Sequence, residues 1–452
     1  MPPPPGSGLK RPALRRVGRP ARPAAFARRD GSAGTPPGVR GARDRPGGAV
    51  RRSRCPARRP GRTGSRGRLR RRQAHARQAR QLPDRPRRHR RRARGGGVSP
   101  RAKKKAEPLL PPGSAETAPA VTLPGRPKTE KLVLFTGFSC NSYCHFCIDL
   151  NKRDVPDKST QQIVREMVEA KGQGVTYLEM IGGETTIRAD FLPLVRTARK
   201  LGFKDVVVVT NGRMLAYPDF AKAAVEAGVT DLIFSIHGHD AKLHDAVTVA
   251  PGAFDQLIKG IENVRALGFK RVFGNCTVVK PNMRHLPDIA RLFLKLAIHH
   301  VEFIFVDPNY GGAYSNFTGL VPRISEAAPY MRQTLDIGRA AGVRHWTVRY
   351  VPLCHFPDHL DQISEIREVS IFRTRHWAPD FKNEDVGASR GQHGRVKTKA
   401  CDGCALYDSC EGLWKEYLKR YDDSELKPVK GPVEIPNWRL IPETPELARK
   451  ER

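Results

Sequence analysis

Short apolar runs alternate with amphipathic segments from Glu130 onward, with a repeat of about thirty residues. Six of these runs are short, bounded by turn residues and rich in β-branched side chains, so they predict β-strands. The predicted strands are Lys131–Phe135, Thr176–Ile181, Asp205–Thr210, Asp231–Ile236, Arg271–Val279 and Val301–Val306. Strands that alternate with helices indicate an α/β protein with a mainly parallel sheet.

The segments between these strands have the periodicity of helices. Ser159 and Gln162 form a capping-box pattern, and Ile163, Met167 and Ala170 then follow on one helical face. Four more helices are predicted at Phe191–Leu201, Asp219–Ala227, Phe254–Leu267 and Leu286–Leu296. Past Pro322 we expect one more long helix, the apolar run Val343–Leu353, a polar stretch and a Cys-rich segment.

Right-handed crossovers would curl six βα units into a partial (β/α)6 TIM-type barrel with functional loops at the C-terminal ends of the strands. A doubly wound open sheet is the alternative from the pattern alone. The predicted organisation is a core barrel over residues 128–320 and a small Cys-rich C-terminal extension over residues 321–452.

The first 127 residues differ in composition from the rest of the chain. Residues 1–105 hold 35 of the 81 basic residues and three of the 45 acidic ones, so this segment carries +32 of the total charge of +36. It is rich in Arg, Pro, Gly and Ala and poor in aromatic and β-branched residues, which predicts a disordered basic N-terminal tail over residues 1–127. We favour a solvated extension over a nucleic-acid-binding arm, and the tail's charge is no evidence that the folded body binds nucleic acid.

The chain has no run of about 18 apolar residues and no apolar signal segment at its N-terminus. We therefore expect a cytoplasmic protein that does not cross a membrane.

Three of the nine cysteines lie within eight residues, directly after the first predicted strand: Cys140, Cys144 and Cys147. An odd number of thiols in a cytoplasmic chain favours a metal over disulfides. Zinc would need a fourth ligand, and His145 is the nearest candidate. In a [4Fe–4S] cluster, three thiolates would leave one iron open to a substrate or cofactor.

This Cys-x3-Cys-x2-Cys segment resembles the cluster motif of the radical S-adenosylmethionine (radical SAM) enzymes, and the resemblance extends from about Lys131 to Asp307. It implies a [4Fe–4S] cluster whose open iron binds the amino and carboxylate groups of SAM. It also implies reductive cleavage of SAM to a 5′-deoxyadenosyl radical that abstracts hydrogen from the substrate. Phe146 occupies the aromatic position that the family places near the adenine.

Further motifs follow in the order that the family shows. Gly182-Gly183-Glu184 resembles the Gly-Gly-Glu motif that holds the SAM amino group, although Thr185 stands where Pro is usual. Glycines let backbone approach a ligand, and a carboxylate at a strand's C-terminal end can pair with an ammonium. The resemblance also implies cofactor-binding roles for three residues of later strands: Asn211 in a Thr-Asn-Gly turn, Ser235 at the end of the fourth strand, and Asn275 on the fifth strand. His237, His239 and His244 suggest a metal site, but their spacing is irregular and they straddle a turn, so we favour surface or substrate-pocket residues.

Four cysteines near the C-terminus remain after Cys55 in the tail and Cys276 in an apolar strand are set aside. They are Cys354, Cys401, Cys404 and Cys410, enough for one closed four-thiolate site. The Cys-x2-Cys-x5-Cys run resembles the SPASM extension of radical SAM enzymes, but Trp414 stands where that pattern expects another Cys. The resemblance implies one auxiliary iron–sulfur cluster, as in the shortened Twitch-type extension, with structural zinc as the alternative.

The resulting hypothesis is a radical SAM enzyme that uses SAM, a catalytic [4Fe–4S] cluster and a second, auxiliary Fe–S cluster. Its expected partners are an electron donor such as flavodoxin or ferredoxin and a peptide or small-molecule substrate; binding of nucleic acid through the tail is not favoured. The loop from Asp307 to Tyr314 is expected to line the pocket. The alternatives are a radical SAM enzyme that modifies RNA, and a non-enzymatic zinc protein that binds nucleic acid.

Overall fold

One curved sheet organises the part of the chain that the computed structural model describes, residues 128–390 and 394–436. The sheet has nine strands in the order β7-β6-β5-β4-β3-β2-β1-β8-β9, and every neighbouring pair is parallel except β8 with β9. Its strands are β1 (Thr129–Phe135), β2 (Tyr177–Ile181), β3 (Asp205–Thr210), β4 (Asp231–Ser235), β5 (Val272–Val278), β6 (His300–Phe305), β7 (His345–Arg349), β8 (Phe372–Trp377) and β9 (Lys382–Asn383).

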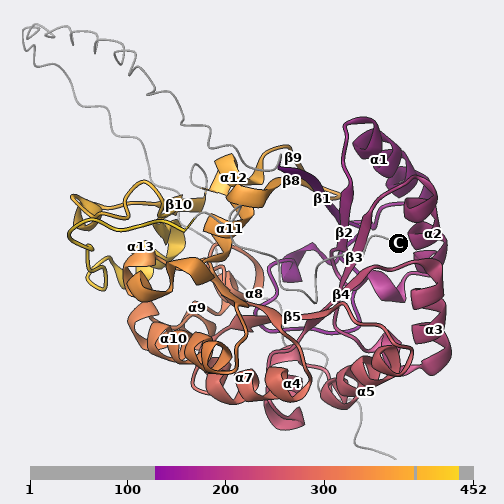
Figure 1. Ribbon diagram of the computed structural model, residues 1–452, viewed down its shortest axis with the longest axis horizontal. Helices are drawn as coiled ribbons and strands as arrows, with labels where there is room; N and C mark the ends of the chain where they lie inside the picture. The colour runs from indigo at the N-terminus through magenta and orange to yellow at the C-terminus, as the bar shows by residue number, and fades with distance from the viewer. Residues whose placement is uncertain (1–127, 391–393, 437–452) are drawn as a thin grey trace, which may run out of the picture. The chain divides into compact units, whose positions relative to one another are not determined.

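The helices cover the convex side of this sheet (Figure 1). The longer ones are α1 (Thr160–Gly172), α2 (Phe191–Lys200), α3 (Pro218–Ala227), α4 (Ala241–Thr248), α5 (Ala253–Ala266), α7 (Leu286–Lys295), α10 (Ile324–Ala340), α11 (Ser364–Ile371) and α13 (Lys415–Tyr421). Shorter helices are α6 (Lys280–Met283), α8 (Gly311–Ser315), α9 (Phe317–Leu320) and α12 (Val386–Ser389). A small antiparallel pair, β10 (Arg395–Val396) with β11 (Leu413–Trp414), lies in the Cys-rich segment.

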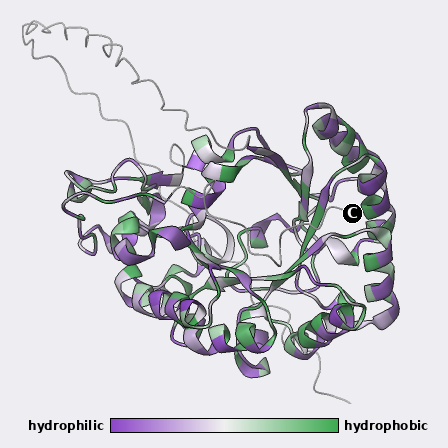
Figure 2. Cartoon of the chain, in the orientation of Figure 1, coloured by the Kyte–Doolittle hydropathy of each residue, from purple (hydrophilic) through white to green (hydrophobic). Residues whose placement is uncertain are grey.

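Burial alternates along the strands because one face of the sheet packs against helices and the other faces the barrel interior. Leu178, Met180 and Phe234 are fully buried on the helix side. Glu179 and Asn275 lie on the opposite face and are only partly buried. Figure 2 shows the same division, since the middle strands are mostly hydrophobic and the helices alternate between hydrophobic and hydrophilic positions. The predicted partial barrel is confirmed.

The predicted elements agree with the structure to within one or two residues for the six core strands. Ser159 caps α1, since its hydroxyl accepts a hydrogen bond from the backbone N–H of Gln162 at 3.2 Å. The sequence did not predict α4, which begins after Asp240, whose carboxylate accepts from the N–H of Leu243 at 2.8 Å.

The sheet is larger than the six predicted strands. β7 extends it beyond β6, and β8 pairs with β1 over six residue pairs from Thr129 with Phe372 to Leu134 with Trp377. The sequence of β8 does not contain an apolar run, because its inward positions carry Thr374 and His376. The pattern of hydrophobic residues therefore gave no signal for this strand.

Charged side chains bridge the gap between the two ends of the parallel sheet, β7 and β8. Arg349 on β7 pairs with Glu368 on α11 at 2.5 Å, and Glu368 also accepts from Thr374 on β8 at 2.9 Å and from Arg390 at 2.8 Å. Burial raises the pKa of Glu368, but Arg349 and Arg390 outweigh it and hold that pKa far below its usual range. The open barrel is thus closed by ion pairs where backbone hydrogen bonds are missing.

The predicted tail, residues 1–127, lies outside the described residues. β7 and β8 follow residue 320 and belong to the same sheet as the core strands. None of the described helices has the length and hydrophobicity needed to span a membrane.

We expect Glu368→Gln to destabilise the protein by about 3–5 kcal/mol, because it leaves Arg349 and Arg390 without their shared carboxylate in a buried site. The measurement is the free energy of unfolding in urea, followed by circular dichroism on the full chain. Glu226→Gln is the matched control, since Glu226 pairs with Lys222 at 3.9 Å on an exposed surface and should change stability by less than about 0.5 kcal/mol. Equal effects of the two substitutions would contradict the closing role of Glu368.

Candidate active site

The three clustered cysteines lie in the loop that follows β1, at the C-terminal end of the sheet. Cys140, Cys144 and Cys147 are each partly buried and form no disulfide. The loop is anchored to the end of α4 by backbone hydrogen bonds from Tyr143 to Thr248 and from His145 to Val247, both 3.0 Å long. This position agrees with the rule that functional loops of such barrels follow the strands.

The three thiols share one buried environment. Burial, together with the neighbouring Cys147 and Cys140, raises the pKa of Cys144 to about 12. Burial also raises the pKa of Cys140 and of Cys147. Thiols of this kind stay protonated unless a cation replaces the protons, so the site suits a metal centre that binds thiolates.

Three cysteine thiols lie in this loop, one fewer than a tetrahedral zinc ion needs. The donor set, three thiolates with a fourth position free, fits a four-iron cluster.

The glycine pair after β2 packs against the backbone that leads to these cysteines. Gly183 donates to the carbonyl of Gly137 at 2.8 Å, and Glu184 donates to that of Ser139 at 2.7 Å. Gly182 has φ +112°, and a Cβ on Gly183 would lie 2.0 Å from the carbonyl oxygen of Ser139. In the structure these two glycines allow the backbone after β2 to approach the backbone of Gly137 and Ser139 closely.

Glu184 connects the Gly-Gly-Glu motif with the Thr-Asn-Gly turn. Its side chain is 3% exposed, and its carboxylate accepts from the Thr210 hydroxyl and from the backbone N–H of Asn211, both at 2.7 Å, and from Thr186. Burial raises the pKa of Glu184, and the N–H of Asn211 opposes that shift. Oε2 accepts only the bond from Asn211 among the described contacts, so it keeps capacity for one more donor.

Asn211 and two arginines hold the cysteine loop in place. The Asn211 amide donates to Asn141 Oδ1 at 2.7 Å and lies 3.9 Å from the sulfur of Cys140. Arg213 donates to the carbonyl of Asn141 and, through Nε, to Gln256 at 2.6 Å. Arg153 donates to the carbonyls of Cys140 at 3.2 Å and Ser142 at 2.8 Å. The sequence analysis did not identify either arginine, although Arg213 directly follows the Thr-Asn-Gly turn.

The remaining predicted cofactor residues lie in the cysteine loop and on β4 and β5. Phe146 is buried and meets the ring of His237 edge to face, with centroids 4.8 Å apart. Ser235 on β4 is paired in register with Asn275 on β5, and both are partly exposed on the interior face. The structure thus brings Phe146, Ser235 and Asn275 to the end of the barrel that holds the cysteine loop.

Two of the three histidines after β4 are buried. Burial lowers the pKa of His237 to about 3 and that of His244 to about 4, so both rings are neutral near pH 7. Nδ1 of His237 accepts from the N–H of Thr277 at 3.2 Å, and Nδ1 of His244 accepts from the N–H of His237 at 3.2 Å. These two are internal supports of the β4 loop, whereas the sequence predicted surface or pocket residues.

The loop after β6 packs on the cysteine loop. Gly312 donates to the carbonyl of Cys147 at 2.9 Å, and a Cβ at Gly312 would meet the carbonyl oxygen of His145 at 1.9 Å. Burial raises the pKa of Asp307 to about 6, and the N–H of Asn309 and the charge of Arg395 oppose the shift. The glycines of this loop serve close packing, while Tyr310 and Tyr314 are exposed.

The four C-terminal cysteines line one small cavity, together with Pro352, Leu406, Leu426 and Pro428. Backbone N–H groups point at the sulfurs: those of Leu353 and Gly412 lie 3.5 and 3.4 Å from Cys410, and that of Val429 lies 3.4 Å from Cys404. Burial, together with the other three cysteines, Cys410, Cys404 and Cys401, raises the pKa of Cys354 to about 11. Four thiols with N–H donors to sulfur fit a fully ligated cluster.

Trp414, at the position where the extension pattern expects a cysteine, is a packing residue. It is 7% exposed on β11, lies edge to face with Tyr350 at 5.2 Å, and carries the guanidinium of Arg395 over its ring at 4.2 Å. Arg395 is itself buried and pairs with Glu411 at 2.8 Å, next to Cys410. Trp414 therefore packs behind the auxiliary site, through Arg395 and Glu411, instead of supplying a thiol.

Comparisons with known proteins agree with these motifs. Residues 134–293 match the family model of the radical SAM superfamily. A probable GTP 3′,8-cyclase of Saccharolobus islandicus is 29% identical over 185 residues, which cover 41% of this chain and 59% of the relative. Mycofactocin maturase MftC of Mycolicibacterium smegmatis is 32% identical over 158 residues, 34% of this chain and 39% of the relative. The match thus spans less than two thirds of these relatives.

Solved structures with a similar arrangement include SuiB of Streptococcus suis bound to the precursor peptide SuiA. It is 16% identical, and the match covers 67% of this chain and 75% of SuiB with a TM-score of 0.49.

We expect Gly183→Ala to lower the iron bound per chain after anaerobic reconstitution, because the new Cβ would displace the backbone at Ser139 and with it Cys140. The measurement is iron content together with absorbance near about 400 nm. Gly172→Ala is the control, since a Cβ there meets nothing within 4 Å. Full iron loading of the Gly183 variant would show that the close contact does not position the cysteines.

Proposed function

We propose, since residues 134–293 match the family model of the radical SAM superfamily, that this chain is an enzyme that cleaves SAM reductively and abstracts hydrogen from a peptide or small-molecule substrate. The observation that carries the proposal is the convergence of three separate motifs on one loop. Gly183 and Glu184 bond to the backbone before Cys140, and Asn211 reaches both Glu184 and the loop. A chance cluster of thiols would not be supported from two further strand ends.

In this proposal Cys140, Cys144 and Cys147 hold a [4Fe–4S] cluster that, when bound, supplies the electron and the SAM-binding position for radical formation. Glu184 orients the SAM ammonium through its free acceptor capacity at Oε2. Phe146 covers the adenine side, and Asn211, Ser235 and Asn275 contact the polar parts of SAM. The electron comes from a flavodoxin or ferredoxin, in keeping with a cytoplasmic enzyme.

Binding of the cluster requires the three cysteines to release their protons. Each cysteine must lose a proton to bind iron, and burial raises the pKa of all three. Arg153 opposes this cost, because its charge lies close to the thiols and lowers their pKa in part. Cluster assembly should therefore be favoured as pH rises through the neutral range.

For the C-terminal site we propose an auxiliary Fe–S cluster bound by Cys354, Cys401, Cys404 and Cys410. The support is the cavity that all four line and the N–H groups directed at Cys404 and Cys410. Zinc remains the alternative metal, with one ion in place of the cluster.

We infer the substrate class from the C-terminal cysteines and from the relatives. A peptide is favoured by the auxiliary cysteines, whose spacing resembles that of peptide-modifying enzymes, and by the similarity to a maturase. A nucleotide is the second candidate, because a GTP cyclase matches over a similar length. Substrate trials should therefore include a peptide set and GTP. An RNA substrate, or nucleic-acid binding by the basic tail, rests on residues outside the described ones.

We expect Cys144→Ala to reduce release of 5′-deoxyadenosine to background, because two thiolates cannot hold the cluster. The assay is chromatography of the products formed from SAM with a strong reductant under anaerobic conditions. Cys276→Ala is the matched control: this thiol is fully buried in β5 and should be dispensable for turnover. Unchanged release from the Cys144 variant, or a colourless zinc-loaded wild-type protein, would refute the proposal.

We expect the reconstituted wild-type chain to bind about eight irons and Cys404→Ala about four, since four thiolates should hold a second cluster. Electron paramagnetic resonance should retain the SAM-responsive signal of the first cluster in this variant. Iron at the wild-type level would exclude Cys404 as a ligand. About four irons and one zinc in the wild-type chain would assign zinc to the C-terminal site.

A further inference from the structure

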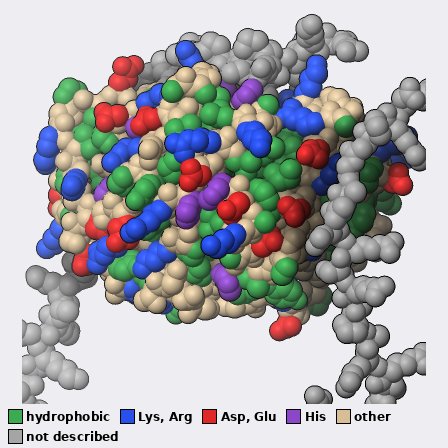
Figure 3. Space-filling model, turned by 90° about the horizontal axis from the view of Figure 1, so that it is seen from below, with side chains coloured by type: hydrophobic (Ala, Val, Ile, Leu, Met, Phe, Trp, Pro, Cys, Tyr) green, Lys and Arg blue, Asp and Glu red, His purple; other side chains and the backbone are tan. Residues whose placement is uncertain are grey.

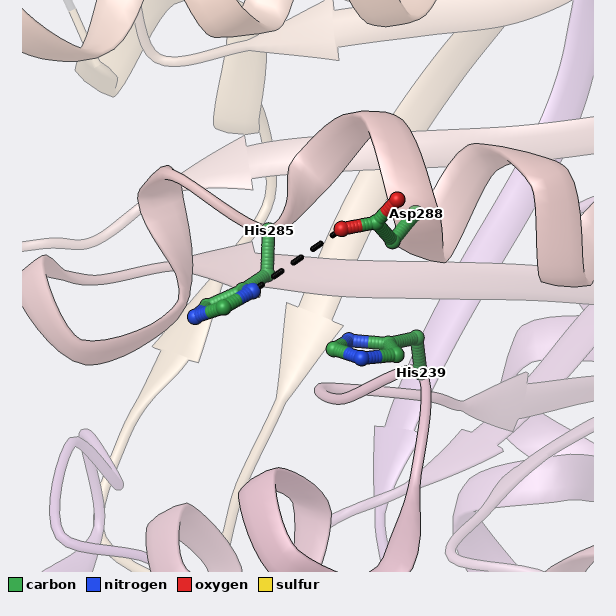
Figure 4. Close-up of side chains that lie close together, drawn as sticks. All are labelled: His239, His285 and Asp288. Carbon is green, nitrogen blue, oxygen red and sulfur yellow. Dashed lines mark ion pairs between the residues drawn. The ribbon is translucent and has the colours of Figure 1, made fainter.

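A second group of metal-binding side chains lies apart from all the cysteines. His239 lies between β4 and α4, His285 directly precedes α7, and Asp288 lies in the first turn of α7. One ligand atom from each residue lies within 4.8 Å of the other two (Figure 4). Figure 3 shows the face that Figure 1 draws lowest, over α4, α5 and α7, where histidine side chains gather near the centre among charged ones.

The imidazole of His239 has a ring nitrogen that is available to bind a metal ion. Its Nδ1 is buried and makes no hydrogen bond within the described residues. Its other nitrogen, Nε2, lies 3.5 Å from the carboxylate of Asp240. A metal-binding histidine commonly directs its second nitrogen at a carboxylate, which fixes the ring and increases its basicity. A buried imidazole nitrogen without a partner is otherwise costly.

Asp288 and His285 place a carboxylate oxygen and an imidazole nitrogen near each other, and both atoms can bind a metal ion. Asp288 Oδ1 accepts from Arg291 at 2.7 Å, which orients the carboxylate. Its other oxygen, Oδ2, lies 3.9 Å from Nδ1 of His285. The rings of His285 and His239 stack with centroids 5.2 Å apart, so both imidazoles meet at the same place. His285 and Asp288 are each 47% exposed, so small rotations of their side chains can shorten these distances to those of a coordinated ion.

We propose that His239, His285 and Asp288 bind a divalent transition-metal ion of the zinc class, with water in the remaining positions. Imidazole suits zinc and neighbouring first-row metals, and two histidines with one carboxylate are a common three-ligand set. The site has no thiol, which distinguishes it from both cysteine sites. The proposal does not depend on the radical chemistry.

The ion would fasten the β4 loop to the start of α7. That loop runs from Ser235 through the buried His237, which packs on Phe146, to His239. On the inner side it is already held by Asn282, whose amide donates to the carbonyl of His237 at 3.0 Å. A metal on the outer side would fix the same loop from its other face, so binding should stabilise the fold and order this wall of the candidate active site.

The test uses the full chain, reconstituted anaerobically, freed of any affinity tag and of loosely bound metal. Zinc ions are titrated by calorimetry while absorbance near about 400 nm reports the clusters. We expect one zinc site that saturates without loss of that absorbance. His285→Ala and Asp288→Asn should each weaken it by at least about tenfold, in line with losing one ligand. Saturating zinc should raise the unfolding temperature of the wild-type chain, and this increase should disappear in both variants.

His299→Ala is the control, because His299 is an exposed histidine outside the group, and its zinc binding should equal that of the wild type. Equal zinc affinity in the wild type and both ligand variants would overturn the proposal. Zinc uptake accompanied by loss of cluster absorbance would also overturn it, since the ion would then be displacing iron at the cysteines.

Discussion

The open sheet depends on a buried carboxylate. Glu368 receives two arginines and a threonine at the gap between β7 and β8, where the barrel lacks a backbone connection. The same set of charges continues to Glu411, which pairs with Arg390 at 2.9 Å and with Arg395 at 2.8 Å. Glu411 directly follows Cys410, so the closure of the barrel and the geometry of the auxiliary site share one set of ion pairs. Because these charges are buried, each needs its partner in place, and loss of one exposes the others to a large desolvation penalty.

Backbone contact, rather than side-chain chemistry alone, organises the catalytic end. The backbone of the cysteine loop forms hydrogen bonds with three other segments: the Gly183–Glu184 turn, the end of α4, and Gly312 after β6. Two arginines, Arg153 and Arg213, then bind its carbonyl oxygens. A loop held in this way keeps its three thiols in position before any metal binds, which lowers the ordering cost of assembly. The glycines matter because no other residue allows backbones to approach so closely.

The sequence predicted much of this arrangement because the relevant signals are local. Apolar runs identified the six core strands, and the cysteine spacing identified both groups of thiols. The hydrophobic pattern gave no correct prediction where the buried side chains are polar. β8 has an interior face of Thr374 and His376, and the sequence contained no signal for the buried ion pair of Arg349 with Glu368. For His237 and His244 the sequence predicted surface or pocket residues; tertiary packing buries both rings and keeps them neutral.

What the sequence determined by itself is the type of chemistry: three thiols in one loop, four more near the C-terminus, and the order of the motifs between them. These depend on residue identity and spacing along the chain, which folding does not change. Only the tertiary structure decided which distant residues meet. Glu184 meets Asn211, Arg213 meets the cysteine loop, and His239 meets His285 and Asp288 across two loops. Such contacts arise because parallel strands bring their C-terminal ends to one edge, so residues far apart in sequence become neighbours through the crossovers alone.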